Sequence, residues 1–269
     1  MCLTALAWQV HPRFPLVLAA NRDEFHHRPT APMQWWDDGH TLAGRDLQAG
    51  GTWLGISRLG RIGLITNVRE PGQHREGLPS RGERIPWWLA PEQSASEMGQ
   101  RLEAVPTNGF NLLGIDLADA GLHYWSNRHP HRLHLRPGIY GLSNASLDTP
   151  WPKLQRLKKE LTAQLNKGLS SSTEWMPALF EALLNRDQPD DAALPSTGIS
   201  MEWERHLGSV FIQTPDGRYG TRCSTVLVAE TLSEDAWRLH VVEQNWVPAM
   251  QPKLSRASRV LVAASNCSR

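Results

Sequence analysis

The chain begins with MCLTALAWQV (residues 1–10), and a second apolar run, FPLVLAA, occupies residues 14–20. Short apolar runs of this length, separated here by a His-Pro-Arg turn, are typical of buried β-strands. The two runs therefore predict a buried hairpin at the N-terminal end of the fold. The polar run Asn21-Arg22-Asp23-Glu24 follows directly, and we expect it to end the second strand.

Cys2 stands directly behind the initiator methionine. Removal of Met1, which is usual when a small side chain follows, would leave Cys2 with both a thiol and a free α-amine. The α-amine titrates near pH ~8, so it can accept the thiol proton and make one residue both nucleophile and base. This arrangement predicts a cysteine-type N-terminal-nucleophile (Ntn) hydrolase. The alternative is that Cys2 is an ordinary residue of a first strand.

The composition is that of a globular protein and argues against several function classes. Of 269 residues, 40% are apolar and the formal net charge is +1, so no long-range field favours nucleic acid or an anionic membrane. No stretch approaches the ~18 apolar residues of a membrane span, and the start lacks the features of a secretory signal. The three cysteines, Cys2, Cys223 and Cys267, are too few for a disulfide framework. We therefore expect a cytoplasmic protein that binds a small molecule, with no nucleic-acid partner and no integral membrane segment. The oligomeric state is not indicated.

Strand-like and helix-like segments occur in groups along the chain. Further strands are expected at residues 52–57, 61–67, 110–117, 121–126, 138–143, 209–213, 219–229 and 236–243. Helices are expected from Ser80 onward and at residues 94–104, 151–167 and 173–185. This order favours two antiparallel sheets with helices outside, rather than an alternating βαβ array. We predict an α+β fold in a single domain, residues 1–269.

An Ntn site needs polar side chains that converge on residue 2, to orient the amine and to stabilise an oxyanion. Candidates stand where predicted strands end: the Asp23 carboxylate for the amine, and the Asn67 and Asn144 amides for the oxyanion. Arg222 lies inside a strong strand pattern, where a guanidinium needs a partner. The alternatives are structural, since asparagines at strand ends commonly form turns, acidic residues there are often solvated, and Arg222 could be a paired structural charge.

Several blocks of the sequence carry a family resemblance. They are MCL with the NRDE run at 21–24, GRDLQAGGTWLGIS (44–57), ITNVREP (65–71), LPSRGE (78–83), FNLLGID (110–116), YGLSNASLDTPWPK (140–153) and YGTRCSTVLV (219–228). In this order they resemble the motifs of the NRDE family, also called the transport and Golgi organisation protein 2 family. The resemblance covers about residues 1–230 and is specific as a set.

The NRDE family is itself similar to cysteine Ntn hydrolases such as penicillin V acylases and bile salt hydrolases. The resemblance therefore implies an Ntn-hydrolase-like, four-layer αββα sandwich. By position it implies Cys2 as the nucleophile, Asp23 as the carboxylate that orients the amine, Asn67 and Asn144 as oxyanion donors, and Arg222 as an arginine near the thiol.

The pattern departs from that of the acylases at one position. In the acylases an arginine stands three residues before the aspartate, and here that position is Ala20. Arg22 adjoins Asp23 instead, and adjacent residues of a strand point to opposite faces. Arg22 is a candidate catalytic residue, and whether its side chain reaches the thiol is left to the tertiary structure.

The resemblance implies hydrolysis of a linear amide or thioester of an unknown small molecule. Because family members are linked to haem trafficking and to lipid or acyl-CoA metabolism, the alternative is a non-catalytic haem or acyl-CoA binding and trafficking protein. Candidate ligand-binding residues are Trp53, Arg69 and Arg81, since tryptophan rings can line an apolar pocket and arginines can hold propionates or phosphates.

Two histidine groups, His26-His27 and the run at residues 129–134, are candidate iron ligands in the haem interpretation. Solvated loop histidines are the alternative. We expect no resident cofactor and no metal site, with haem only as a candidate ligand. The chain lacks Walker, dinucleotide-glycine, CxxC and HExxH motifs, which argues against nucleotide hydrolysis, disulfide redox chemistry and zinc proteolysis.

Overall fold

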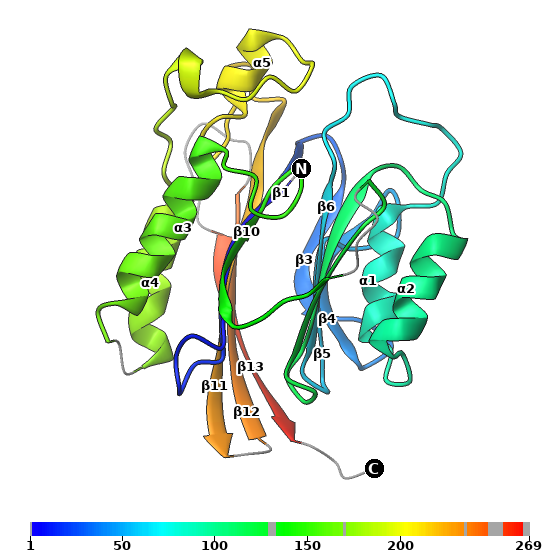
Figure 1. The fold of residues 1–269 in the computed structure, drawn as a ribbon, viewed down its shortest axis with the longest axis vertical. Coiled ribbons are helices and arrows are strands. Elements are labelled where there is room, and N and C mark those ends of the chain that lie inside the picture. The colour runs from blue at the N-terminus through cyan, green and yellow to red at the C-terminus, as the bar shows by residue number, and fades with distance from the viewer. Residues whose placement is uncertain (1, 129–132, 169–170, 234–235, 247–254, 266–269) are drawn as a thin grey trace.

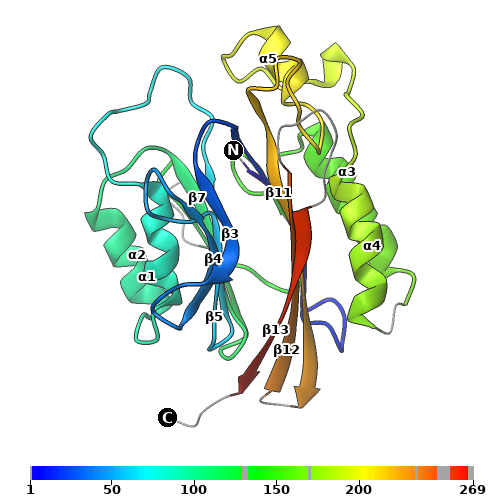
Figure 2. The same cartoon turned by 180° about the vertical axis from the view of Figure 1, so that it is seen from behind.

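The computed structural model describes residues 2–128, 133–168, 171–233, 236–246 and 255–265. Two antiparallel β-sheets face each other, and helices cover the outer side of each sheet (Figures 1 and 2). The layer order is helix, sheet, sheet, helix, which confirms the predicted αββα sandwich. Within the described ranges, no helix combines the length and the apolar character needed to span a bilayer.

The first sheet, sheet A, contains the N-terminal hairpin. Its strand order is β10-β1-β2-β11-β12-β13, with antiparallel pairing throughout. The strands are β1 (Cys2–Trp8), β2 (Leu16–Phe25), β10 (Gly138–Leu142), β11 (Tyr219–Ser233), β12 (Ala236–Asn245) and β13 (Ser255–Ser265). The hairpin therefore lies inside the sheet, with neighbours on both sides.

The second sheet, sheet B, is a meander in chain order. Its strands are β3 (Thr30–Trp35), β4 (Thr41–Asp46), β5 (Leu54–Ser57), β6 (Arg61–Asn67), β7 (Phe110–Asp116), β8 (Gly121–Ser126) and β9 (Leu133–His134). Helices α1 (Arg84–Leu89) and α2 (Ala95–Ala104) cover sheet B, and α3 (Pro152–Leu165) and α4 (Ser172–Leu183) cover sheet A. The short helix α5 (Met201–His206) lies near the end of the sandwich where β1 begins (Figure 1).

Successive side chains of β1 point alternately into two separate hydrophobic cores. Leu6 and Trp8 pack between the two sheets, whereas Leu3 and Ala5 pack against α3 and α4. A strand that is covered on both faces needs apolar residues at almost every position, which explains the unbroken apolar run of the sequence. A third core lies between sheet B and the helices α1 and α2.

Helix α3 approaches sheet A closely because β10 carries a glycine. A Cβ atom on Gly141 would lie 2.7 Å from Cδ1 of Leu154, so any larger residue would push the helix outward. Pro152 occupies the first turn of α3, where its missing N–H costs nothing. This contact holds the first turn of α3 against β10 and the neighbouring strand β1.

Two expectations about the strands were wrong, and some strands were not predicted. The NRDE run does not end the second strand, because β2 continues through Phe25 and pairs with β1 and β11. Residues 209–212 are buried without forming a strand, and the exposed Gln213 makes a single bridge, to Gly220. Strands β3 and β4 were not predicted. Pro32 lies in β3, which is the edge of sheet B and the one place where a sheet tolerates proline.

Candidate active site

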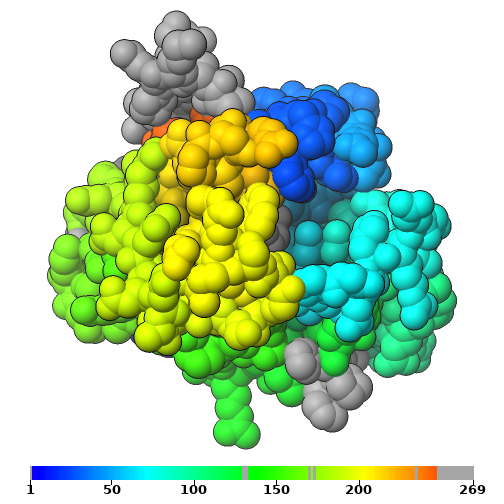
Figure 3. All heavy atoms as spheres, turned by 90° about the horizontal axis from the view of Figure 1, so that it is seen from above, coloured from blue at the N-terminus to red at the C-terminus, as the bar shows by residue number. Residues whose placement is uncertain are grey.

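Cys2 is the first residue of β1, and its side chain belongs to the core between the sheets. It is 7% exposed and borders a cavity of about 100 Å³. Figure 3 looks onto this end of the molecule, where a hollow opens between the blue N-terminal segments, the cyan loop and the yellow segment around α5. The cavity brings together six of the predicted site residues: Cys2, Arg22, Asp23, Trp53, Asn67 and Arg81.

Arg22 lies directly opposite Cys2 in the antiparallel pairing of β1 and β2. Residues that are directly opposite in such a pair point to the same face, so the guanidinium and the thiol share the inter-sheet side. Arg22 is only 5% exposed, and its guanidinium stacks on the Trp53 ring at 4.2 Å. It also forms an ion pair with Asp46 at 3.6 Å and donates to Thr30 Oγ1 at 3.2 Å. Arg22 therefore lies on the same side of sheet A as the thiol.

Asp23 points to the other face of sheet A, toward the helices. It is fully buried, and Thr221 Oγ1 donates to its Oδ1 at 2.8 Å. Burial raises the pKa of the Asp23 carboxyl, and the opposing charge of Lys153 lowers it in part. Because Asp23 also borders the cavity at the start of β1, it lies where a processed N-terminus would need a carboxylate.

Lys153 is a buried charge that the sequence analysis did not identify. It stands in the first turn of α3, is 4% exposed, and its Nζ has no hydrogen-bond partner among the described residues. Burial lowers the pKa of Lys153 to about 8, and Asp23 opposes this shift. The signal was present in the block that ends TPWPK, because a proline at the start of a helix places the next residue in its first turn.

Asn67 and Asn144 are hydrogen-bonded neighbours, and of the two only Asn67 borders the cavity. Asn144 is 1% exposed, and its Nδ2 donates to the backbone carbonyl of Asn67 at 2.9 Å. Asn67, at the end of β6, borders the cavity, and its side chain makes no hydrogen bond with any described residue. The β1–β10 register pairs Thr4 with Leu142, so two further steps would place Asn144 beside Cys2.

Arg222 does not border the cavity. A β-bulge lies between Thr221, which pairs with Asp23, and Cys223, which pairs with Arg22, so Arg222 is the extra residue. Its Nη1 donates to the backbone carbonyls of Phe25, His26 and Arg28, at 2.9, 3.3 and 3.0 Å respectively. The described contacts of Arg222 therefore hold the segment that follows β2, and none of them reaches the thiol.

Two sequence blocks meet in the cavity wall through glycine. A Cβ atom on Gly51 would lie 2.5 Å from the backbone carbon of Gly82, and Thr52 N donates to Gly82 O at 3.2 Å. This close approach brings Arg81 to the cavity, where its Nη1 donates to Gly109 O at 3.1 Å. Burial lowers the pKa of Arg81, and the carboxylate of Glu24 opposes that shift.

Arg69 faces away from the cavity. Its side chain is 6% exposed, forms an ion pair with Glu204 of α5 at 2.9 Å and lies over the Trp151 ring at 4.8 Å. Two of its nitrogens, Nε and Nη2, have no hydrogen-bond partner among the described residues. The predicted ligand-binding set is thus divided, with Trp53 and Arg81 at the cavity and Arg69 beneath α5.

Burial and the charges around the cavity shift the pKa of the Cys2 thiol in opposite directions. Burial raises the pKa of the Cys2 thiol, and the Asp23 carboxylate adds to the increase. The Arg22 guanidinium lowers it. A thiolate at this position therefore depends on Arg22 and on whatever base is supplied at the N-terminus.

The described residues contain no group of three or more His, Cys, Asp or Glu side chains arranged to hold a metal ion. His26 is half-buried and His27 is exposed, and both lie just after β2. Of the second histidine group, residues 129–132 lie outside the described residues. The ring of His134 of β9 meets the His123 ring edge-on, with centroids 5.0 Å apart.

The layers and the position of the cysteine define the class of protein. An αββα sandwich with a cysteine at the head of an inner strand, facing the space between the sheets, is an Ntn-hydrolase-like fold. The family model described as Transport and Golgi organisation 2 matches residues 1–247 of the chain. The chain therefore belongs to the Transport and Golgi organisation 2 family, as the resemblance of its motifs predicted.

Curated relatives agree with this assignment. The chain is 34% identical over 251 residues to the Transport and Golgi organization protein 2 homolog of Bos taurus, covering 86% of this chain and 89% of that protein. It is 26% identical over 267 residues to the Transport and Golgi organization protein 2 of Drosophila melanogaster, covering 91% and 92%. Among solved structures, it is similar to a Caenorhabditis elegans ortholog of N-acylethanolamine-hydrolyzing acid amidase, with 12% identity, a TM-score of 0.48, and coverage of 84% and 92%.

Proposed function

We propose that the protein is a cysteine Ntn hydrolase that cleaves a linear amide or thioester of a small molecule after Met1 has been removed. The observation that carries the proposal is the placement of Cys2 at the head of β1, in a cavity shared with Arg22 and Asp23. The thiol and the guanidinium lie on one face of sheet A, and the carboxylate lies on the other. The α-amine of a processed Cys2 would stand between them.

In the proposed reaction the α-amine acts first as a base and then, as the ammonium, as an acid. The α-amine takes the thiol proton, and the Cys2 sulfur forms a bond to the carbonyl carbon. The amides of Asn67 and Asn144 stabilise the oxyanion, a contribution of roughly 3–4 kcal/mol per donor in comparable sites. Asn144 Nδ2 already donates to Asn67 O and keeps its second hydrogen for this purpose. The ammonium then protonates the leaving amine or thiol, and water hydrolyses the acyl-enzyme to release a carboxylic acid.

The size of the cavity limits what enters it. A volume of about 100 Å³ has room for several water molecules, which is enough for a carbonyl group and its nearest substituents. The rest of a substrate would extend toward the mouth, where Glu24, Arg28 and Arg81 bring charges of both signs. We therefore expect a substrate whose scissile bond lies near one end.

The first test is intact-mass spectrometry of purified protein before and after iodoacetamide treatment, with Cys2→Ala as the comparison. We expect loss of Met1 and one carbamidomethyl group more on the wild type than on Cys2→Ala under native conditions. Retention of Met1, or equal alkylation of both proteins, would contradict catalysis by Cys2. A thioester such as S-phenyl thioacetate should then transfer one acetyl group to the wild type and none to Cys2→Ala.

One observation favours the second candidate, a non-catalytic haem or acyl-CoA binding and trafficking protein. Burial raises the pKa of the Cys2 thiol, which keeps the sulfur protonated and unreactive unless the N-terminus supplies a base. Titration with haem, followed at the Soret band, tests this candidate separately. Saturable binding at micromolar protein, without acyl transfer to Cys2, would favour trafficking over hydrolysis.

A further inference from the structure

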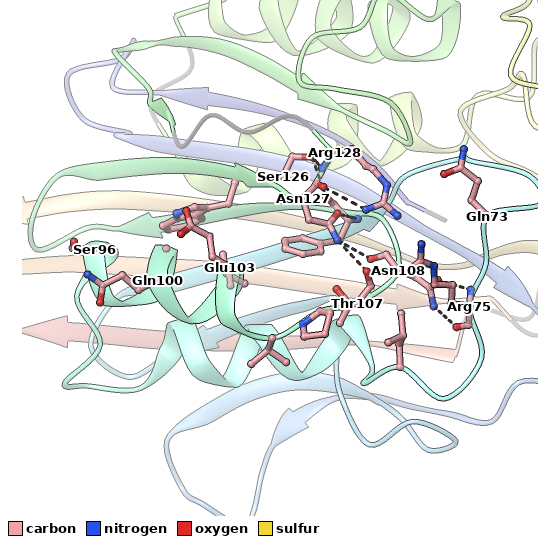
Figure 4. Close-up of a pocket in the computed structure, with 17 residues that line it drawn as sticks. Gln73, Arg75, Ser96, Gln100, Glu103, Thr107, Asn108, Ser126, Asn127 and Arg128 are labelled. Carbon is pink, nitrogen blue, oxygen red and sulfur yellow. Dashed lines mark hydrogen bonds between the residues drawn. The ribbon is translucent and has the colours of Figure 1, made fainter.

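A larger cavity, of about 850 Å³, lies on the outer face of sheet B, between α2 and the strands β7 and β8 (Figure 4). We call it the α2 groove. Its lining includes Phe110 and Trp125, which belong to the core between sheet B and the helices, whereas Cys2 belongs to the core between the sheets. The groove is therefore separated from the Cys2 cavity by sheet B, and the proposed hydrolase chemistry does not use it.

One end of the groove is held by a network of hydrogen bonds. Asn108 accepts from Arg75 N at 2.8 Å and donates to Arg75 O at 2.9 Å, which fixes the loop before α1 against the start of β7. Asn127 accepts from Phe110 N at 2.9 Å and donates to Thr107 O at 3.1 Å. A groove framed in this way is formed before any ligand arrives, as small-molecule sites usually are.

One part of the groove wall is apolar. Leu102, Phe110 and Trp125 are each at least nine-tenths buried and form its wall. Its volume lies within the roughly 300–1,000 Å³ that is usual for small-molecule pockets. Aromatic walls favour a ring-bearing ligand, because stacked or edge-on ring contacts add to the burial of apolar area.

Two polar atoms in the lining are unsatisfied. Trp125 Nε1 and Thr107 Oγ1 are shielded from solvent, and neither has a hydrogen-bond partner in the part of the chain that the structure describes. The indole N–H can only donate, and the hydroxyl can donate as well as accept. Buried donors are paired in nearly all proteins, so the ligand best matched to this lining carries hydrogen-bond acceptors.

The charged residues at the hydrogen-bonded end of the groove also favour a ligand that carries hydrogen-bond acceptors. Arg128 is paired with Glu70, at 2.5 and 2.6 Å, whereas the Arg75 guanidinium has no side-chain partner among the described residues. Figure 4 places Arg75, Thr107 and Asn108 together at this end, and Gln100 and Glu103 on α2 at the other. A guanidinium without a side-chain partner, at the same end of the groove as the Thr107 hydroxyl, favours an anionic group.

We propose that the α2 groove is a binding site for a small amphiphilic anion. Its apolar, ring-bearing body would lie against Phe110 and Trp125, and its carboxylate or sulfonate would face Thr107 and Arg75. The proposal does not depend on hydrolysis at Cys2, because it uses residues on the opposite side of sheet B.

The test uses the full chain and anilinonaphthalene sulfonate, a fluorescent aromatic anion. We expect one saturable site with micromolar affinity. Arg75→Gln and Thr107→Val should each weaken binding about fivefold or more, since removing one hydrogen-bond partner commonly has an effect of that size. Phenylnaphthylamine, which has similar rings and no sulfonate, should bind all three proteins equally. Arg218→Gln is the matched control, because Arg218 is a highly exposed arginine outside the groove.

Two further measurements keep the outcome decisive. Thermal unfolding and near-ultraviolet circular dichroism must match between the variants and the wild type, since this probe also binds partly unfolded protein. The rate of Cys2 alkylation by iodoacetamide should be unchanged by saturating probe. Absence of saturable binding, wild-type affinity in either Arg75→Gln or Thr107→Val, or protection of Cys2 by the probe would each overturn the proposal.

Discussion

Arg22 lies directly opposite Cys2 across the β1–β2 pair, so the guanidinium and the thiol occupy the same side of sheet A. Asp23, the next residue, faces the helices on the other side and accepts a hydrogen bond from Thr221. Two adjacent residues of the NRDE run thus point to opposite faces of sheet A. This division assigns the thiol to Arg22 and the amine to Asp23 in the proposed mechanism.

Replacing Arg22 should slow the reaction of the thiol. In Arg22→Gln the pKa of Cys2 loses its nearby lowering charge, so less thiolate is present at a given pH. We expect alkylation by iodoacetamide near neutral pH to slow by about three- to tenfold, because the thiolate is the nucleophile and less of it is present. Arg222→Gln is the matched control and should leave the rate unchanged, because Arg222 binds backbone carbonyls outside the cavity. Equal rates for Arg22→Gln and the wild type would contradict the assignment.

Lys153 should leave a signature in the pH dependence of stability. Its pKa in the folded protein is about 8, below the ordinary value of 10.5, so the unfolded chain binds more protons between these two values. The free energy of unfolding gains from this group as pH rises from about 8 to 10.5, by up to about 3 kcal/mol. Urea unfolding of Lys153→Met should lack this rise.

The comparison with the wild type isolates Lys153, because the cysteines and tyrosines that titrate in the same window are common to both proteins. Lys158→Met is the control. Lys158 stands on the same helix, is partly exposed, and pairs with Asp148 at 2.5 Å. If Lys153→Met and Lys158→Met change the pH profile alike, Lys153 is not a buried group of lowered pKa.

Substitution of Asn144 should lower stability, whereas substitution of Asn67 should mainly lower activity. Asn144→Ala leaves the backbone carbonyl of Asn67 without its donor, so we expect a loss of about 1–3 kcal/mol in the free energy of unfolding. Asn67→Ala removes a side chain with no hydrogen bond to the described residues, so its effect on stability should stay within about 1 kcal/mol. If Asn67 donates to the oxyanion, thioester cleavage by Asn67→Ala falls by about 10²–10³. Urea unfolding and product formation measure the two effects.

Gly51 should tolerate no side chain. In Gly51→Ala the new Cβ meets the backbone of Gly82 at 2.5 Å, so the two blocks that form the cavity wall must separate. We expect a cost of about 1–3 kcal/mol, as for other overpacked sites. Gly50→Asn is the control, because Gly50 has a positive φ that asparagine accepts and no atom lies within 4 Å of its added Cβ. Chemical denaturation of both variants measures the difference, and a fully stable Gly51→Ala would show that the wall is not tightly packed.

Local patterns predicted much of the fold and part of the site. The apolar runs at 2–10 and 14–20 predicted the inner hairpin, because strands covered on both faces need apolar residues throughout. The position of Cys2 predicted the centre of the candidate site. Strand β3 was missed because its proline is compatible with an edge position that only the assembled sheet defines.

The remaining parts of the site depend on contacts between distant residues. The bulge that directs Arg222 away from the thiol is a property of the β2–β11 pairing and leaves no local mark in either strand. Lys153 is buried because Gly141 lets α3 approach the sheet, a contact between residues in different elements. The sequence by itself determined the two antiparallel sheets with helices outside and the position of Cys2, since hydrophobic periodicity and a position in the chain are local properties. The αββα class followed from the resemblance of its motifs to a family. Only the tertiary structure decided which arginine shares the cavity with the thiol and which buried charge lies near Asp23, because strand register and helix packing act across the whole chain.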